Sequence, residues 1–251
     1  MWGAAGAAGY PLASLEMRRT WDALAAGDTA VYVGDPTSGT DELAGLFGRL
    51  GADPRGGRCV EVGCGPGRMT GALAERFDEV VAVDVSPAML EQARANVTAP
   101  NVRFVAVSGE RLDGVDDATA DVLVCYLVLQ HLPSARIVRL YLSEFARVLA
   151  PAGESFVQIP VLDGVIGRLR RTLRAPLLHW TRRPDRGAAF RGYRLTRPEL
   201  GAALDDARLR TTAEDEGPSA YRSCRDRFLR DRPRPKAGGR PDRRRRAASH
   251  R

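Results

Sequence analysis

Five short runs of apolar and β-branched residues, separated by stretches with helical character, constrain the fold of this chain most. They are RCVEVG, EVVAVDV, VRFVAV, DVLVCYL and ESFVQIP, at positions 58–63, 79–85, 102–107, 121–127 and 154–160. Continuous apolar runs of this length are typical of strands buried on both faces of a parallel sheet. Strands and helices that alternate in this way predict a right-handed, doubly wound α/β sheet.

The remaining elements are predicted from start and stop signals. We expect helices at 68–77, 87–96, 134–149 and 196–207, and the last two strands at 209–213 and 219–228. Ser86 is a predicted N-cap, with Pro87 at the first helical position. Pro151 and Gly153 are predicted to end the helix at 134–149. Positions 12–50 have helical character around a turn-rich gap at 33–41.

We therefore expect three parts. An N-terminal helical cap at 1–50 precedes an α/β domain at 51–229, in which 161–195 forms an insertion, and an Arg-rich tail at 230–251 is predicted to be disordered. The Ala- and Gly-rich positions 1–15 are interpreted as a flexible start and not as a signal peptide. Four cysteines without metal-ligand spacing, and no apolar run near the roughly 20 residues of a membrane span, favour a cytoplasmic protein with reduced thiols.

The net charge of +7 is divided unevenly along the chain. Positions 1–160 carry 13 Arg against 20 acidic residues, whereas 161–194 carry 9 Arg against 2 Asp, and 225–251 carry 12 basic residues against 3 acidic ones. A nucleic-acid enzyme more often spreads cationic residues across the face that holds its active site. The basic tail is therefore not taken as evidence for a nucleic-acid partner.

A glycine-rich turn follows the first predicted strand, in the segment Val60-Glu61-Val62-Gly63-Cys64-Gly65-Pro66-Gly67-Arg68. Its glycines let a ligand lie against bare backbone. The dinucleotide fingerprint G-x-G-x-x-G would need its third glycine at position 68, which is Arg68. The spacing therefore favours a cofactor other than a pyrophosphate-bearing dinucleotide.

Two acidic residues beside this turn indicate what the cofactor carries. Glu61 lies two residues before Gly63 and can receive an ammonium group directly or through water, and Asp84 at the end of the next strand can accept ribose hydroxyls. S-adenosylmethionine has an amino-acid moiety, a ribose and no phosphate. Together, in a strand–helix–strand context, the two acids and the glycine turn predict S-adenosylmethionine as the cofactor.

The segments VEVGCGPGRMTGALA, VVAVDVSPAMLEQARAN, NVRFVAVSGERL, DVLVCYLVLQHLP and ARVLAPAGESFVQIP resemble successive motifs of class I S-adenosylmethionine-dependent methyltransferases. The resemblance is closest to the bacterial small-molecule type-11/type-12 group, covers roughly 58–160, and extends weakly to about 228. It implies a seven-stranded Rossmann-like sheet with an N-terminal helical cap and an insertion after the fifth strand. It also implies cofactor contacts at the following residues: Glu61, Gly63, Cys64, Gly65, Gly67, Asp84, Val85 and Met89.

Two further segments complete the predicted cofactor site. Where many relatives have Asp after the third strand, this chain has Ser108, so that the backbone of Gly109 and Glu110 would hold the edge of the adenine. The fourth strand ends in Cys125-Tyr126-Leu127, whose backbone is expected to face the methionine moiety. His131 follows and has two readings, as a general base or as a residue that orients the loop or the cofactor.

Several alternatives stay open at this point. Trp21, Tyr32 and Tyr193 can line the pocket, although ordinary packing is the more frequent role of such residues. The segment 161–180 is read first as a substrate lid and second as a basic amphipathic helix in peripheral contact with an anionic membrane. The Arg run at 243–246 is interpreted as part of a solvated extension. The alternatives are binding of a nucleic acid or a membrane, or a tail produced by a shifted or extended reading frame.

The predicted function is transfer of a methyl group from S-adenosylmethionine to a small or lipid-like acceptor by in-line displacement, a reaction that depends mainly on orientation. No metal-ligand cluster is recognised. The alternatives are a non-catalytic S-adenosylmethionine-binding regulator or partner protein and, less favoured, a nucleotide-cofactor oxidoreductase. The acceptor, its methylated atom and the oligomeric state are not predicted.

Overall fold

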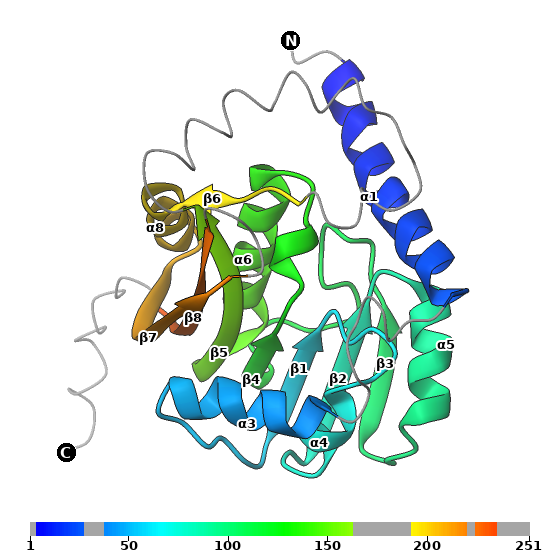
Figure 1. Cartoon of the computed structure of the whole chain (residues 1–251), viewed down its shortest axis with the longest axis vertical. Coiled ribbons are helices and arrows are strands. Elements are labelled where there is room, and N and C mark those ends of the chain that lie inside the picture. The colour runs from blue at the N-terminus through cyan, green and yellow to red at the C-terminus, as the bar shows by residue number, and fades with distance from the viewer. Residues whose placement is uncertain (1–3, 28–37, 163–191, 220–223, 235–251) are drawn as a thin grey trace, which may run out of the picture.

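The computed structural model describes residues 4–27, 38–162, 192–219 and 224–234, which form a single sheet with helices on both faces (Figure 1). The strand order is β3-β2-β1-β4-β5-β8-β7, with β6 beside β5. The strands are β1 Arg58–Val62, β2 Glu79–Asp84, β3 Val102–Ala106, β4 Ala120–Cys125, β5 Leu149–Leu162, β6 Leu195–Thr196, β7 Leu209–Pro218 and β8 Cys224–Pro233. Among the strands that the structure describes, only β8 runs antiparallel to its neighbours, β5 and β7. The predicted doubly wound, mostly parallel α/β sheet is confirmed, with the two-residue β6 as an additional strand.

The helices lie around this sheet. They are α1 Ala4–Ala25, α3 Gly39–Arg49, α4 Thr70–Ala74, α5 Pro87–Asn96, α6 Ala135–Val148 and α8 Arg197–Asp206, with a short 3-10 helix η2 at Leu129–His131. Figure 1 shows α3 in front of the sheet and α1 extending beyond α5 at the side of β3. Within the described ranges, no helix is long and apolar enough to cross a membrane.

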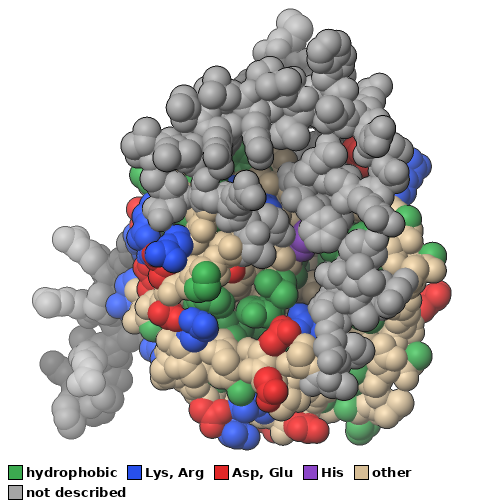
Figure 2. Space-filling view, in the orientation of Figure 1, with side chains coloured by type: hydrophobic (Ala, Val, Ile, Leu, Met, Phe, Trp, Pro, Cys, Tyr) green, Lys and Arg blue, Asp and Glu red, His purple; other side chains and the backbone are tan. Residues whose placement is uncertain are grey.

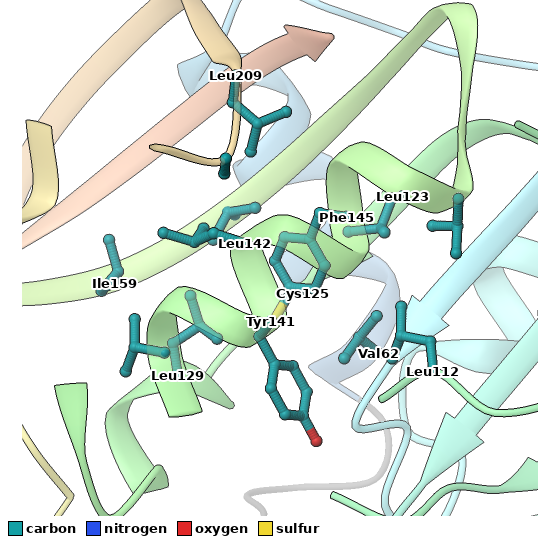
Figure 3. Packing of buried hydrophobic residues seen from close by; sticks show 14 of the residues in the cluster. Val62, Leu112, Leu123, Cys125, Leu129, Tyr141, Leu142, Phe145, Ile159 and Leu209 are labelled. Atoms are coloured by element: carbon teal, nitrogen blue, oxygen red, sulfur yellow. The ribbon is translucent and has the colours of Figure 1, made fainter. Parts of the chain in front are cut away.

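The central strands contribute side chains alternately to two hydrophobic clusters, one on each face of the sheet. In β1, Val60 and Val62 belong to one cluster and Cys59 to the other. The first cluster includes Tyr141, Leu142 and Phe145 of α6, which pack against strand residues in Figure 3. The second includes Leu43, Leu46 and Phe47 of α3. Both faces are covered, which explains why the central strands are apolar along their whole length.

Local capping fixes where several helices begin. Ser86 caps α5 by accepting a hydrogen bond from Met89 N at 3.1 Å, with Pro87 at the first helical position, as predicted. Ser134 caps α6 in the same way, and Thr196 forms a capping box with Glu199 in α8. These caps set the residues at which α5, α6 and α8 begin.

The structure corrects several predicted boundaries. Helix α4 covers only Thr70–Ala74, because the glycine turn continues to Met69. Strand β5 begins at Leu149, directly after α6, and so includes Pro151 and Gly153. Strands β7 and β8 extend beyond the predicted 209–213 and 219–228.

Two segments predicted to be irregular are ordered. The flexible start predicted for 1–15 is wrong from Ala4 onward, where α1 begins. The disorder predicted from 230 is wrong for 230–233, which belong to β8. There Arg230 and Arg232 form ion pairs with Glu154 of β5. These ion pairs compensate for the charge of β8, which has few apolar residues. Most of the predicted insertion (163–191), Tyr32 and the tail from 235 lie outside the described residues.

Candidate functional site

A cavity opens at the carboxyl ends of β1, β2 and β4, with about 1030 Å³ of space between atoms, its open mouth included. Its walls come from α1, the turn after β1, the end of β2 and the segment that follows β4. Figure 2 shows hydrophobic side chains gathered in the hollow on this face, with acidic and basic side chains beside them. This position, outside the carboxyl ends of the strands, is where open α/β sheets bind ligands.

The glycine turn has backbone conformations that require glycine. Gly63, Gly65 and Gly67 have φ values of +74°, +54° and +90°. A Cβ on Gly63 would lie 2.4 Å from Cγ2 of Val128 in the opposite wall of the cavity. A Cβ on Gly67 would lie 3.0 Å from Cγ2 of Val97. Gly63 and Gly65 line the cavity together with Cys64, whereas the structure shows Gly67 packed next to the end of α5.

Asp84 is buried at the end of β2 and joins the glycine turn to the start of α5. Its Oδ2 accepts a hydrogen bond from Gly65 N at 2.8 Å, and its Oδ1 accepts one from Ser86 N at 2.9 Å. Burial raises the pKa of Asp84, an effect that these backbone N–H groups partly oppose. Each carboxylate oxygen has a second lone pair, so that Asp84 can still accept hydrogen bonds from a ligand in the cavity.

Glu61 is the second buried acid of the cavity, on β1. Thr70 Oγ1 donates a hydrogen bond to its Oε2 at 2.6 Å. Burial raises the pKa of Glu61 to about 7. Arg68, whose side chain is 6% exposed, also lines the cavity and forms an ion pair with Glu42 of α3. A cationic ligand group beside Glu61 would favour its ionised form.

Helix α1 closes one side of the cavity with Met17 and Trp21. The Trp21 ring meets the His131 ring edge-on, with centroids 5.1 Å apart and planes at 84°. Packing is the more frequent role of such a tryptophan, but the structure places Trp21 in the cavity wall. No local sequence signal could show this, because it depends on how α1 lies across the sheet edge.

Hydrogen bonds hold α1 beside the cavity. Ser86 Oγ donates to Asp22 Oδ1 at 2.5 Å, and Gln92 Nε2 of α5 donates to the carbonyl of Ala25 at 2.6 Å. Ser14 Oγ donates to Glu110 Oε1 at 3.1 Å. The helix is therefore joined both to the N-terminus of α5 and to the loop after β3.

The segment after β4 forms the opposite wall. Tyr126, Leu127, Val128, Gln130 and His131 all line the cavity. Burial raises the pKa of the Tyr126 hydroxyl, and the nearby Glu42 carboxylate raises it further. The side chains of the adjacent residues Gln130 and His131 meet with their Nε2 atoms 3.1 Å apart. Tyr126 and His131 thus both line the cavity, and their roles toward the cofactor and the acceptor remain predictions.

The loop after β3 lies behind α1. Ser108 Oγ accepts from the backbone of Glu110 at 3.4 Å and of Arg111 at 3.3 Å, which closes a local turn. A Cβ on Gly109 would lie 2.9 Å from Cε of Met17. The structure thus brings Ser108, Gly109 and Glu110 close to α1 and not to the cavity lining, and their cofactor contacts remain predictions. Tyr193 packs in the first hydrophobic cluster, and its N–H donates to the carbonyl of Leu132 at 2.7 Å.

The side chains that line the cavity fit S-adenosylmethionine. Glu61 and Asp84 provide acceptors for an ammonium group and for hydroxyls, while Val85 and Met89 provide apolar surface for a ring. Arg68 is the one cationic side chain among the described lining residues, and it is paired with Glu42. That donor set suits a cofactor without phosphate. In the described part of the chain, no group of three His, Cys, Asp or Glu residues could hold a metal ion.

Comparisons with known proteins agree with this geometry. Residues 59–153 match the family model described as a methyltransferase domain. The chain is 35% identical over 118 residues to trans-aconitate 2-methyltransferase of Methylobacterium radiotolerans, which covers 46% of this chain and 42% of that protein. It is 29% identical over 114 residues to ubiquinone biosynthesis O-methyltransferase of Idiomarina loihiensis, which covers 45% and 42%. The matches thus span less than half the length of these curated relatives.

Solved structures show the same fold at low identity. An S-adenosylmethionine-dependent methyltransferase from Leishmania major aligns with a TM-score of 0.64 at 15% identity, covering 87% of this chain and 82% of that one. The N-methyltransferase NodS from Bradyrhizobium japonicum, in complex with S-adenosyl-l-homocysteine, aligns with a TM-score of 0.62 at 15% identity, covering 88% and 100%. The predicted resemblance is confirmed, and S-adenosylmethionine is the cofactor that fits this domain. Residues 59–153 of the chain therefore form a methyltransferase domain of the class I S-adenosylmethionine-dependent kind.

Proposed function

We propose that this chain transfers a methyl group from S-adenosylmethionine to a small-molecule acceptor. The observation that carries the proposal is the pair of buried carboxylates, Glu61 and Asp84, on either side of the glycine turn in one largely apolar cavity. The relatives named above are methyltransferases of small molecules by their names, which supports the same reaction class.

Each side of the cavity has a proposed role. When bound, S-adenosylmethionine supplies a methyl group on a sulfonium with a good leaving group, so that alignment is the main requirement of the reaction. Asp84 accepts hydrogen bonds from the ribose hydroxyls, and Glu61 receives the ammonium group. Val85 and Met89, which line the cavity at the start of α5, pack on the adenine.

The acceptor is proposed to enter on the side of Tyr126, Gln130 and His131. For an acceptor with a hydroxyl group, the His131 imidazole, held edge-on by the Trp21 ring, would take the proton as the oxygen attacks, and its Nε2 would have to be released from Gln130 for that step. The described lining is largely apolar and its Arg68 is paired with Glu42, and we propose a small or lipid-like acceptor. A reducing compartment such as the cytoplasm is part of the proposal, since all four cysteines are free thiols and three of them are buried.

A methyl-transfer assay tests the proposal. The protein is incubated with S-adenosylmethionine and a panel of phenols, carboxylic acids and lipids that includes trans-aconitate, and both S-adenosylhomocysteine and methylated products are measured by mass spectrometry. Turnover of at least one acceptor is expected. Cofactor binding without turnover of any acceptor would favour the non-catalytic regulator, and binding of NADH in place of S-adenosylmethionine would favour the oxidoreductase.

A matched pair of glycine variants connects activity to the cavity. In Gly63→Ala the new methyl group meets Val128 and the positive φ is strained, so cofactor binding is expected to fall at least tenfold. In Gly45→Ala, on α3, the new methyl group has no neighbour within 4 Å. That control variant is expected to bind and react like the wild type. Equal binding by the two variants would contradict the proposed place of the cofactor.

A further inference from the structure

One residue in the cavity wall holds an unusual backbone conformation. Leu127, directly after Tyr126, has a φ of +60°, in a region that residues other than glycine, asparagine and aspartate rarely adopt. Its side chain lines the cavity, and the chain turns there from β4 toward η2. A strained residue of this kind persists only where neighbouring groups hold it, and such residues gather at functional sites.

The side chain of Gln158 provides that support. Gln158 lies on β5, is 1% exposed, and accepts a hydrogen bond from Leu127 N through Oε1 at 3.2 Å. Because a backbone N–H needs an acceptor, the amide oxygen has to face Leu127. The Nε2 group is therefore directed elsewhere, and it is buried without a hydrogen-bond partner among the described residues.

The segment held in this way determines the shape of the wall. Val128 packs against Gly63, at a distance that leaves no room for a Cβ on that glycine. The carbonyl of Val128 accepts from His131 N at 2.9 Å, which begins the turn that presents Gln130 and His131 to the cavity. A shift at Leu127 would therefore move the surface that faces the glycine turn.

We propose that Gln158 is a positioning residue of the cofactor site, which fixes the backbone at Leu127 and thereby the cavity wall from Leu127 to His131. The inference rests on the proposed function. Gln158 is not among the residues that line the cavity, and so it acts through Leu127. A role in packing alone would be served as well by an apolar side chain, since the buried Nε2 without a partner is unfavourable.

Three variants separate positioning from packing. Gln158→Met keeps the length of the side chain and removes both polar atoms. Gln158→Glu keeps an oxygen that can accept from Leu127 N. Ser155→Ala is the control, because Ser155 is also buried on β5 with a hydroxyl that has no partner among the described residues, yet lies on the opposite face of the strand. Each variant is titrated calorimetrically with S-adenosylhomocysteine beside the wild type at the same pH.

Gln158→Met is expected to bind S-adenosylhomocysteine about tenfold more weakly, the effect of one lost hydrogen bond. Its Tm should stay within a few degrees of the wild type, because the loss at Leu127 is offset by removal of the unpaired Nε2. Gln158→Glu should stay within about threefold of the wild-type affinity, and Ser155→Ala should be unchanged. This combination would support positioning, since a defect in packing would not be rescued by glutamate.

Wild-type affinity in Gln158→Met would overturn the inference and leave the proposed function intact. No binding by the wild type would overturn the proposed function and the inference with it. If Gln158→Met fails to fold, amide hydrogen exchange of the wild type decides. Slow exchange at Leu127 in the free protein is expected, and exchange as fast as in an unstructured peptide would overturn the inference.

Discussion

At the scale of single residues, the site depends on two acids that the fold keeps away from water. Asp84 accepts hydrogen bonds from backbone N–H groups, whereas Glu61 has the hydroxyl of Thr70 as a partner and a pKa raised to about 7 by burial. Glu61 is therefore partly protonated near neutral pH in the free protein. This makes it a residue whose charge responds to the ligand beside it.

The first prediction concerns stability against pH. The pKa of Glu61 is about 7 in the folded protein and near the ordinary 4.5 when unfolded, so that the folded state binds more protons between these values. Stability is therefore lost as pH rises from about 4.5 to 7, at a cost on the order of 3 kcal/mol once Glu61 is ionised. Glu61→Gln should remove that loss, so that its gain in Tm over the wild type is larger at pH 8 than at pH 5. An equal difference in Tm at both pH values would contradict the buried, protonated acid.

The second prediction concerns binding at the same residue. An ammonium group beside Glu61 favours the carboxylate, so the affinity of the wild type for S-adenosylhomocysteine should rise severalfold between pH 6 and pH 8. In Glu61→Gln the affinity should be lower and change little over this range. Calorimetry in buffers of different ionisation enthalpy measures both the affinity and the proton release. A wild-type affinity that does not change with pH would count against the ammonium contact.

At the scale of elements, the position of α1 decides how closed the cavity is. Met17 and Trp21 reach the cavity because Asp22, Ser14 and the carbonyl of Ala25 connect the helix to α5 and to the loop after β3. The apolar strands and the glycine turn were predictable because their signals are local. Trp21 was one of three aromatic candidates for the pocket, and the sequence could not select it, since its position depends on contacts between segments more than 60 residues apart, as in the hydrogen bond from Ser86 to Asp22.

The third prediction tests this connection. Asp22→Ala removes the carboxylate that accepts from Ser86 Oγ and, at 3.4 Å, from Ala88 N, and it leaves α1 less firmly held. We expect S-adenosylhomocysteine to dissociate about fivefold faster, as a single hydrogen bond to a charged group would allow. Stopped-flow fluorescence, with Trp21 in the cavity wall as a reporter, measures the rate. Arg19→Ala, an exposed position on the same helix, is the control and should leave the rate unchanged.

At the scale of the whole molecule, the sheet continues further toward the C-terminus than the sequence indicates. Strand β8 contains several charged residues and lacks the apolar run that marks the central strands. Its charges are compensated by long-range pairs, as between Arg230 and Glu154, and Asp231 is fully buried with Thr211 as a hydrogen-bond donor at 2.7 Å. Pairs of this kind cannot be read from local sequence, which is why the predicted boundary fell inside the strand.

The fourth prediction compares two truncations. A chain ending at 234 keeps all of β8 and its pairing with β5 and β7, so that its Tm should stay within about 2 °C of the full chain. A chain ending at 229 loses the pairs of 230–233 and should be lower in Tm by more than 5 °C, or fail to fold. Differential scanning calorimetry measures both. Equal loss in the two truncations would show that 235–251 contribute to stability and would contradict the predicted tail.

The central claim is that the cavity between the glycine turn, α1 and the segment after β4 binds S-adenosylmethionine through Asp84. Calorimetric titration of the wild type and of Asp84→Asn with S-adenosylhomocysteine tests it most directly, with circular dichroism to show that both are folded. Asparagine keeps the volume and one acceptor oxygen but loses the charge and the second oxygen. The account predicts one binding site per wild-type chain and an affinity at least tenfold weaker in Asp84→Asn. Equal affinities, or no binding by the wild type, would contradict it.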